Sequence, residues 1–115
     1  MKKRKILFIC TANQCRSPTA EWLYAKNDDL EVMSAGIHPQ AVNPVSRELL
    51  AWADRIFVFE REQQSEIRRF APDLYANLEI ECLYIPDDYA YQDPLLVAIL
   101  TERLSKYLGP PQRKR

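Results

Sequence analysis

The sequence predicts an α/β fold in which a four-stranded parallel sheet lies between two layers of helices. Short, continuously apolar segments rich in β-formers alternate with longer amphipathic segments along the 115 residues. Such an alternation gives parallel strands joined by right-handed crossovers. The length fits one domain covering residues 1–115, with a basic tail from about residue 109.

Four segments have the composition of strands buried in a sheet. Runs of Ile, Leu, Phe and Val without regular polar alternation are typical of strands covered on both faces. The segments are 5–10, 31–35, 55–59 and 78–84. Ligands of such sheets bind beyond the carboxyl ends of the strands, so the loop after the first strand is the first place to look for a site.

Helix signals stand between these strands. Ser17 followed by Pro18 predicts an N-cap and a helix running to about residue 27. Asn43 followed by Pro44 repeats the signal before the second helix. Trp22 lies on the first of these helices and is expected to be a packing residue.

The second half of the chain predicts two more helices and a loose end. Residues 60–70 read as a charged surface helix, and Asp93 caps the last helix. Gly109, followed by two prolines, stops that helix, and the tail is expected to be loose.

Composition excludes several classes of protein. No apolar run approaches the ~18–20 residues of a membrane span, so no membrane association is expected. Sixteen basic residues balance sixteen acidic ones, but seven of the basic residues lie at the two ends and the rest of the chain is acidic, which does not indicate a nucleic-acid-binding face. Three cysteines at irregular spacing do not make a disulfide framework, and a reducing cytoplasm is the expected location.

The loop after the first strand carries the main functional signal. Cys10 and Arg16 are separated by five residues: Thr11, Ala12, Asn13, Gln14 and Cys15. A loop of this length suffices to curl around one tetrahedral oxyanion with its backbone N–H groups pointing inward, helped by the N-terminus of the next helix. Arg16 can add a bidentate fork, and the same donors are expected to stabilise a thiolate on Cys10.

A proton donor for a leaving group is available at the same edge of the sheet. Asp87 and Asp88 follow the fourth predicted strand, and either carboxyl would supply general-acid catalysis without a metal. A zinc site built from cysteines is not expected, because the spacing of Cys10 and Cys15 is wider than that of the usual zinc pairs.

At this point the sequence resembles a known family. The string FICTANQCRSPTAEW is similar to the V-C-x-G-N-x-C-R-S-P-x-A-E signature of the low-molecular-weight protein tyrosine phosphatases. The similarity continues in MSAG at 33–36, in IFVFE at 56–60 and in DDY at 87–89, which resembles the family's D-P-Y. The resemblance identifies the chain as a short, divergent member.

The resemblance implies a two-step hydrolysis of phosphate monoesters without a cofactor. It implies that Cys10 is the nucleophile and that Arg16 and the backbone amides of residues 11–16 bind the phosphate oxygens. Asp87 is the implied general acid, and Asp88 is the alternative.

The resemblance also implies supporting residues. Ser17 would stabilise the sulfur as a leaving group, and Asn13 would hold the loop together with Ser34. Tyr89 would line the mouth of the pocket, and Cys15 would form a reversible disulfide that protects the nucleophile.

Three departures from the family pattern are visible. Ala12 replaces the family's loop glycine, so Asn13 must take any left-handed conformation in the loop. Asp88 replaces the proline of D-P-Y, which makes it the rival acid. The stretch between 36 and 55 is shorter than in the family, leaving residues 37–39 as candidates for the pocket wall.

The function predicted is that of a cytoplasmic, cysteine-dependent phosphatase acting on a phosphorylated protein or a small aryl phosphate. The first alternative is an arsenate reductase on the same fold, which passes oxidation to two further cysteines in the second half of the chain, where this sequence has Cys82 alone. The second alternative is a catalytically weak phosphate-binding module.

Overall fold

A computed structural model describes residues 2–112. Its strands are β1 (Arg4–Cys10), β2 (Leu30–Gly36), β3 (Arg55–Val58) and β4 (Ile80–Cys82). Its helices are α1 (Arg16–Tyr24), α2 (Arg47–Trp52), α3 (Arg61–Phe70), α4 (Pro72–Tyr75) and α5 (Pro94–Leu108). The strands form one parallel sheet in the order β2-β1-β3-β4, so the predicted fold class is confirmed.

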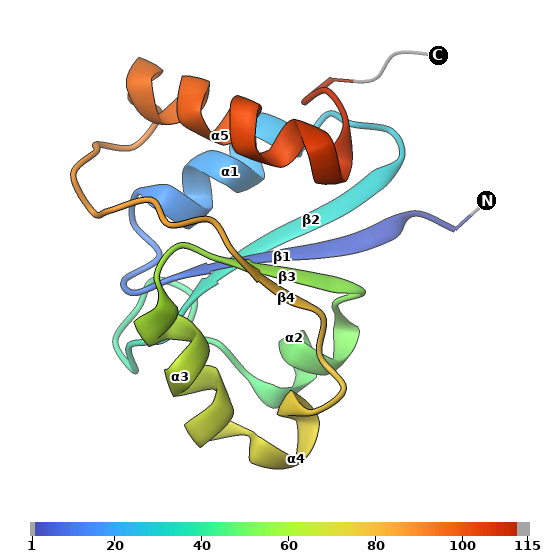
Figure 1. Ribbon diagram of the computed structural model, residues 1–115, viewed down its shortest axis with the longest axis vertical. Coiled ribbons are helices and arrows are strands. Elements are labelled where there is room, and N and C mark those ends of the chain that lie inside the picture. The colour runs from blue at the N-terminus through green and yellow to red at the C-terminus, as the bar shows by residue number, and fades with distance from the viewer. Residues whose placement is uncertain (1, 113–115) are drawn as a thin grey trace.

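The helices cover both faces of the sheet (Figure 1). Helices α1 and α5 lie on one face, and α2, α3 and α4 lie on the other. Alternate residues of β1 enter the two cores: Phe8 packs on the α1/α5 side and stacks on Phe57, with ring centroids 5.7 Å apart, whereas Ile9 packs on the other side with Ile67. A central strand buried on both faces explains why the run in β1 is continuously apolar.

The predicted start of the first helix is wrong. Helix α1 begins at Arg16 with Cys15 as its N-cap residue, whose side chain makes no capping hydrogen bond. Ser17 was expected to cap the helix, but its hydroxyl contacts Cys10 and Asn13 instead. The serine therefore serves the loop rather than the helix end.

The predicted cap of the second helix is also wrong. Ser46 caps α2 by accepting a hydrogen bond from the backbone N–H of Leu49 at 3.1 Å. Asn43 instead donates through Nδ2 to the carbonyl of Ser34 at 2.7 Å. The expected cap thus ties the loop after β2 back to the strand.

The expectations for the fourth strand and for Trp22 need correction, and one short helix was not expected. The fourth strand is β4, which is shorter than the predicted 78–84, and Tyr84 has a φ of 56° that interrupts the extended backbone. Trp22 does not pack as predicted, since its side chain is 48% exposed. Helix α4, which begins at Pro72, was not predicted separately from the preceding helix.

The end of the described chain is held against α1 rather than loose. The Tyr24 hydroxyl donates to the carbonyl of Gly109 at 3.0 Å, and Asn27 Nδ2 donates to the carbonyl of Pro110 at 3.0 Å. The basic residues 113–115 of the predicted tail lie outside the described residues. None of the helices formed by residues 2–112 has the length and apolar character needed to cross a bilayer.

Because the phenol of Tyr24 is buried, the free energy of unfolding is expected to fall at alkaline pH. Burial raises the pKa of Tyr24 from 10.0 to about 12, so the folded protein keeps a proton that the unfolded chain loses above pH 10. The contribution of this phenol to the free energy of unfolding is fully present below pH 10 and declines by about 2 kcal/mol as the pH rises to 12. Urea denaturation of the wild type and Tyr24→Phe at pH 8 and pH 11 measures the difference. An equal loss in both proteins would show that Tyr24 is not its source.

Candidate active site

The loop between β1 and α1 encloses a small cavity at the carboxyl edge of the sheet. The cavity has a volume of about 70 Å³. It is lined by Cys10, Ala12, Gln14, Cys15, Arg16 and Asp87. A water molecule occupies roughly 30 Å³ in the liquid, so the space is on the scale of one small anion.

Cys10 lies at the base of this cavity and is hydrogen-bonded to a serine. Its thiol is 2% exposed, and its Sγ lies 2.9 Å from Ser17 Oγ. The Ser17 hydroxyl also lies 3.3 Å from the carbonyl of Ala35. With a thiolate on Cys10, the Ser17 hydroxyl is the group that can donate to the sulfur.

Asn13 holds the loop in its curled shape. It takes a left-handed conformation with φ of 57°, which confirms the expectation for a loop without glycine, whereas Ala12 does not have a positive φ. Asn13 Nδ2 donates to Ser17 Oγ at 2.8 Å and to Ser34 Oγ at 3.0 Å. Ser34 in turn donates to Glu21 Oε1 at 2.5 Å. The amide thus offsets the left-handed backbone with two buried hydrogen bonds.

The backbone of the loop is oriented for anion binding. The carbonyls of Cys10, Thr11 and Ala12 accept hydrogen bonds from the backbone N–H groups of residues 37, 38 and 42, at 3.0, 3.0 and 3.2 Å. In the part of the chain that the structure describes, the N–H groups of residues 11–15 have no partner. Carbonyls engaged on the outside and free N–H groups along one loop are the arrangement of an anion nest.

Gly36 makes the close approach of β2 to this loop possible. A Cβ atom at this position would lie 2.6 Å from the carbonyl oxygen of Thr11 and 2.6 Å from Ala41 Cβ. Either contact would displace the segment that holds the loop carbonyls. The glycine of the MSAG string is therefore required by packing.

Arg16 is a buried cation with two of its three nitrogens left for the cavity. Its side chain is 2% exposed. Nη1 donates to Glu60 Oε1 at 2.8 Å and to the carbonyl of Ile85 at 2.9 Å. Nε and Nη2 have no hydrogen-bond partner within residues 2–112, and Nε lies 3.7 Å from Asp87 Oδ1. These two nitrogens form the fork that matches two oxygens of a phosphate.

The structure separates the two candidate acids. Asp87 lines the cavity beside Arg16 and is 69% exposed, so a substrate oxygen can reach its carboxyl. Asp88 is not among the residues that line the cavity. Tyr89 does not line it either, because it packs against the core cluster on the α1/α5 face. The arrangement favours Asp87 as the acid.

The remaining sequence candidates lie in different parts of the structure, some at the loop and some away from it. Cys15 and Gln14 line the cavity, and Cys15 is a free thiol. Cys82 packs against the core on the α2/α3 face, where burial raises the pKa of its thiol. His38 lies in the loop after β2, and its Nδ1 accepts from the backbone N–H of Gln40. Within residues 2–112, no three His, Cys, Asp or Glu side chains converge as a metal site would require.

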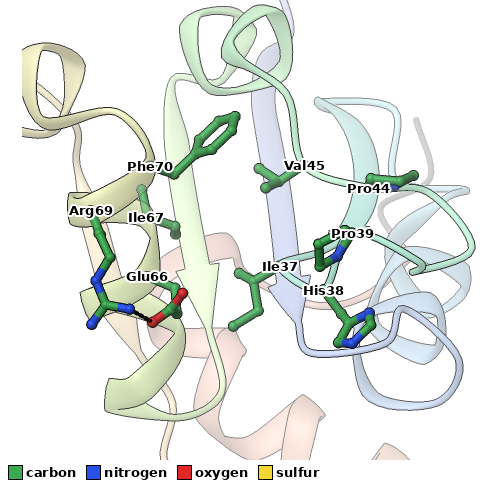
Figure 2. A pocket seen from close by; sticks show the side chains of 9 residues that line it. All are labelled: Ile37, His38, Pro39, Pro44, Val45, Glu66, Ile67, Arg69 and Phe70. Atoms are coloured by element: carbon green, nitrogen blue, oxygen red, sulfur yellow. Dashed lines mark ion pairs between the residues drawn. The ribbon is translucent and has the colours of Figure 1, made fainter.

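A second, larger hollow lies on the α2/α3 side of the sheet (Figure 2). It has a volume of about 340 Å³ and a mainly apolar lining, and it shares no lining residue with the anion cavity. Figure 2 shows Val45 and Phe70 extending toward each other from the loop after β2 and from α3. Glu66 and Arg69 form an ion pair on its α3 side.

Sequence reasoning missed three residues that contact the loop or its supporting hydrogen bonds. Glu60 binds Arg16, Glu21 binds Ser34, and Gln63 Nε2 donates to Thr11 Oγ1 at 3.3 Å. Residues 60–70 were interpreted as a charged surface helix, yet Gln63 is fully buried. The local signal was a capping-box spacing, and the backbone N–H of Glu60 does donate to Gln63 Oε1 at 2.9 Å. That spacing predicts a helix start but not the contact with Thr11.

Comparison with known proteins agrees with this geometry. Residues 5–53 match the sequence profile of the low molecular weight phosphotyrosine protein phosphatases. The tyrosine phosphatase Wzb from Escherichia coli K30, solved in complex with phosphate, has the same fold, with a TM-score of 0.76 and 22% identity over 92% of this chain and 96% of that chain. The first half of the chain is thus similar in sequence to the low-molecular-weight phosphatases, and residues 2–112 share their fold.

Curated proteins that are similar to the chain carry another activity in their names. An arsenate reductase from Staphylococcus aureus (strain Newman) is 49% identical over 53 residues, which is 44% of this chain and 40% of the relative. An arsenate reductase from Bacillus licheniformis is 35% identical over 82 residues, which is 70% of this chain and 55% of the relative. The chain therefore matches about half or less of the length of these relatives.

Asn13 combines a conformational and a hydrogen-bonding role that two variants separate. Asn13→Gly keeps the left-handed backbone free of strain but loses both side-chain hydrogen bonds, whereas Asn13→Ala loses the bonds and adds strain. We expect both variants to unfold more easily than the wild type, and Asn13→Ala to be less stable than Asn13→Gly by about 1 kcal/mol. Urea denaturation measures both free energies of unfolding. Equal stability of the two variants would contradict the strain at this position.

Proposed function

We propose that the chain is a cysteine-dependent phosphomonoesterase of the tyrosine phosphatase type. One observation carries the proposal: Cys10, the Arg16 side chain with its Nε and Nη2 not hydrogen-bonded within residues 2–112, and the carboxyl of Asp87 line one small cavity. The proposed substrate is a phosphorylated protein or a small aryl phosphate in the cytoplasm. No cofactor is part of the proposed reaction.

In the first step, the Cys10 thiolate attacks phosphorus in line with the leaving oxygen. The sulfur–phosphorus bond forms while the bond from phosphorus to the leaving oxygen breaks, and Asp87 transfers its proton to that oxygen. The backbone N–H groups of residues 11–15 and Arg16 would bind the three equatorial oxygens, where charge is spread in the transition state.

In the second step, water displaces the sulfur. Asp87, now ionised, takes a proton from the water as the new oxygen–phosphorus bond forms and the sulfur–phosphorus bond breaks. Ser17 would donate its hydrogen bond to the departing thiolate, a role supported by the 2.9 Å contact with Cys10. Inorganic phosphate is released, and the thiolate is regenerated.

We propose that the loop holds the phosphate and that the aryl group of a substrate lies outside the cavity. Tyr89, two residues beyond Asp87, is only partly buried against the core, and we propose that its exposed part contacts the aryl group beside the cavity. Cys15 is proposed as the partner of a reversible disulfide with Cys10, which would protect the nucleophile from irreversible oxidation.

Arsenate reduction is the second candidate function, because the curated relatives are named for it. Reduction of arsenate to arsenite takes two electrons, which thiols supply by forming a disulfide. The second half of this chain offers Cys82 alone. Burial is the main cause that raises the pKa of Cys82, and a thiol that resists ionisation is a poor nucleophile for such a relay. Phosphate ester hydrolysis is therefore favoured.

Hydrolysis of para-nitrophenyl phosphate by three variants tests the mechanism. Cys10→Ser is expected to abolish turnover, because an alcohol does not replace the thiolate at neutral pH. Asp87→Asn is expected to lower kcat by about 10²–10⁴, the usual contribution of a general acid. Asp88→Asn is expected to have a much smaller effect. Turnover that survives Cys10→Ser, or a larger loss for Asp88→Asn than for Asp87→Asn, would contradict these roles.

A parallel assay with arsenate and a thiol reductant separates the two candidate activities. We expect ester hydrolysis to exceed arsenate reduction and to be unchanged in Cys82→Ser. Arsenate reduction that exceeds hydrolysis and is lost in Cys82→Ser would replace the phosphatase proposal by the reductase. Phosphate binding without either turnover would indicate a binding module.

A further inference from the structure

Gln63 is a fully buried polar side chain between α3 and the anion-binding loop. Its Oε1 accepts from the backbone N–H groups of Phe59 at 2.7 Å and of Glu60 at 2.9 Å. Its Nε2 donates to Thr11 Oγ1 at 3.3 Å and to Glu60 Oε1 at 3.4 Å. Both ends of the amide are therefore in use, two bonds as acceptor and two as donor.

These contacts join the two ends of the loop. Thr11 is the first residue after the nucleophile, and Arg16 is the last residue of the motif. Gln63 binds the first through its amide N–H, and Glu60 binds the second through a 2.8 Å ion pair. Because Gln63 also binds Glu60, the first turn of α3 holds the start and the end of the loop at the same time.

The carboxylate of Glu60 needs this support, since its side chain is 47% exposed. An exposed carboxylate paired with a cation gains little unless it is held in one geometry. The amide of Gln63 restricts Glu60 to the position in which it engages Nη1 of Arg16. That leaves Nε and Nη2 facing the cavity.

We infer that Gln63 is a positioning residue for oxyanion binding: it fixes Glu60, and through it the fork of Arg16, relative to Thr11 and the loop backbone. It acts on the anion site itself and not on the chemistry that follows. The inference therefore holds whether the bound oxyanion is a phosphate ester or arsenate.

The chemistry of the site requires an amide at this position. The two backbone N–H groups need an acceptor and the Glu60 carboxylate needs a donor, whereas the Thr11 hydroxyl can donate or accept. An amide supplies an acceptor oxygen and two N–H donors in one side chain, which matches the four bonds formed. Gln63→Glu keeps the size and the acceptor oxygens but removes the donor and places a second carboxylate beside Glu60. A negative side chain in the first turn of a helix is favourable for the helix itself, so a purely structural role as a cap would survive this change.

The test is the affinity for inorganic phosphate, measured by titration calorimetry at pH 7 on the full chain. Gln63→Glu is expected to bind phosphate about tenfold more weakly, while remaining folded by circular dichroism. The matched control is Gln64→Glu, the same change one residue along α3, where Nε2 donates to the Tyr75 hydroxyl at 3.1 Å away from the loop. The control is expected to bind phosphate as the wild type does.

A second variant changes the other partner of the hydrogen bond between Gln63 and Thr11. Thr11→Val removes the acceptor Oγ1 with little change in shape, and it is also expected to weaken phosphate binding. Thr101→Val is its control, since that hydroxyl bonds only within α5. The double variant Thr11→Val/Gln63→Glu is expected to lose no more affinity than Gln63→Glu alone, because both changes break one connection.

Wild-type phosphate affinity in folded Gln63→Glu would overturn the inference, and so would losses that add in the double variant. If Gln63→Glu does not fold, Thr11→Val decides: weaker binding supports the inference, and unchanged binding overturns it. Phosphate affinity is measured without turnover. A failure of the phosphatase proposal would therefore leave this result unaffected.

Discussion

The burial of one arginine organises the carboxyl edge of the sheet. A buried guanidinium is costly unless its charge is paired and its N–H groups are bonded. Arg16 is 2% exposed, and it meets this requirement with Glu60 at the start of α3 and with the carbonyl of Ile85 after β4. Three parts of the chain that are distant in sequence are thus fixed around one side chain.

This pairing uses one nitrogen of Arg16 and leaves the N–H groups of the other two without a hydrogen-bond partner among residues 2–112, although Asp87 Oδ1 lies 3.7 Å from Nε. Nη1 is satisfied by protein atoms, while Nε and Nη2 face the cavity near the exposed carboxyl of Asp87. The backbone N–H groups of residues 11–15, which have no partner within residues 2–112, are further donors available to an anion. The site is therefore preorganised for a negative ligand before the ligand arrives, which is the condition under which electrostatic stabilisation is most effective.

The sequence was sufficient to predict the sheet, the loop and the residues of the motif. Apolar strands are recognisable because β1 and β3 are covered on both faces, and the cysteine–arginine spacing lies within one local segment. The helix starts at Ser17 and Asn43 were mispredicted for a common reason: each side chain has a tertiary partner that displaces its expected capping bond. Gln63 and Glu60 were missed because their role depends on contacts with residues some fifty positions away, which no local pattern reveals.

The left-handed Asn13 has a consequence for the lifetime of the protein. Asparagine is the residue that makes a glycine-free loop possible here, but its amide is also chemically labile. Hydrolysis to aspartate would replace the donor of two hydrogen bonds, to Ser17 and Ser34, by a negatively charged acceptor. The loop therefore depends on the integrity of a single amide, because its loss would remove both of the buried hydrogen bonds that hold the left-handed residue in place.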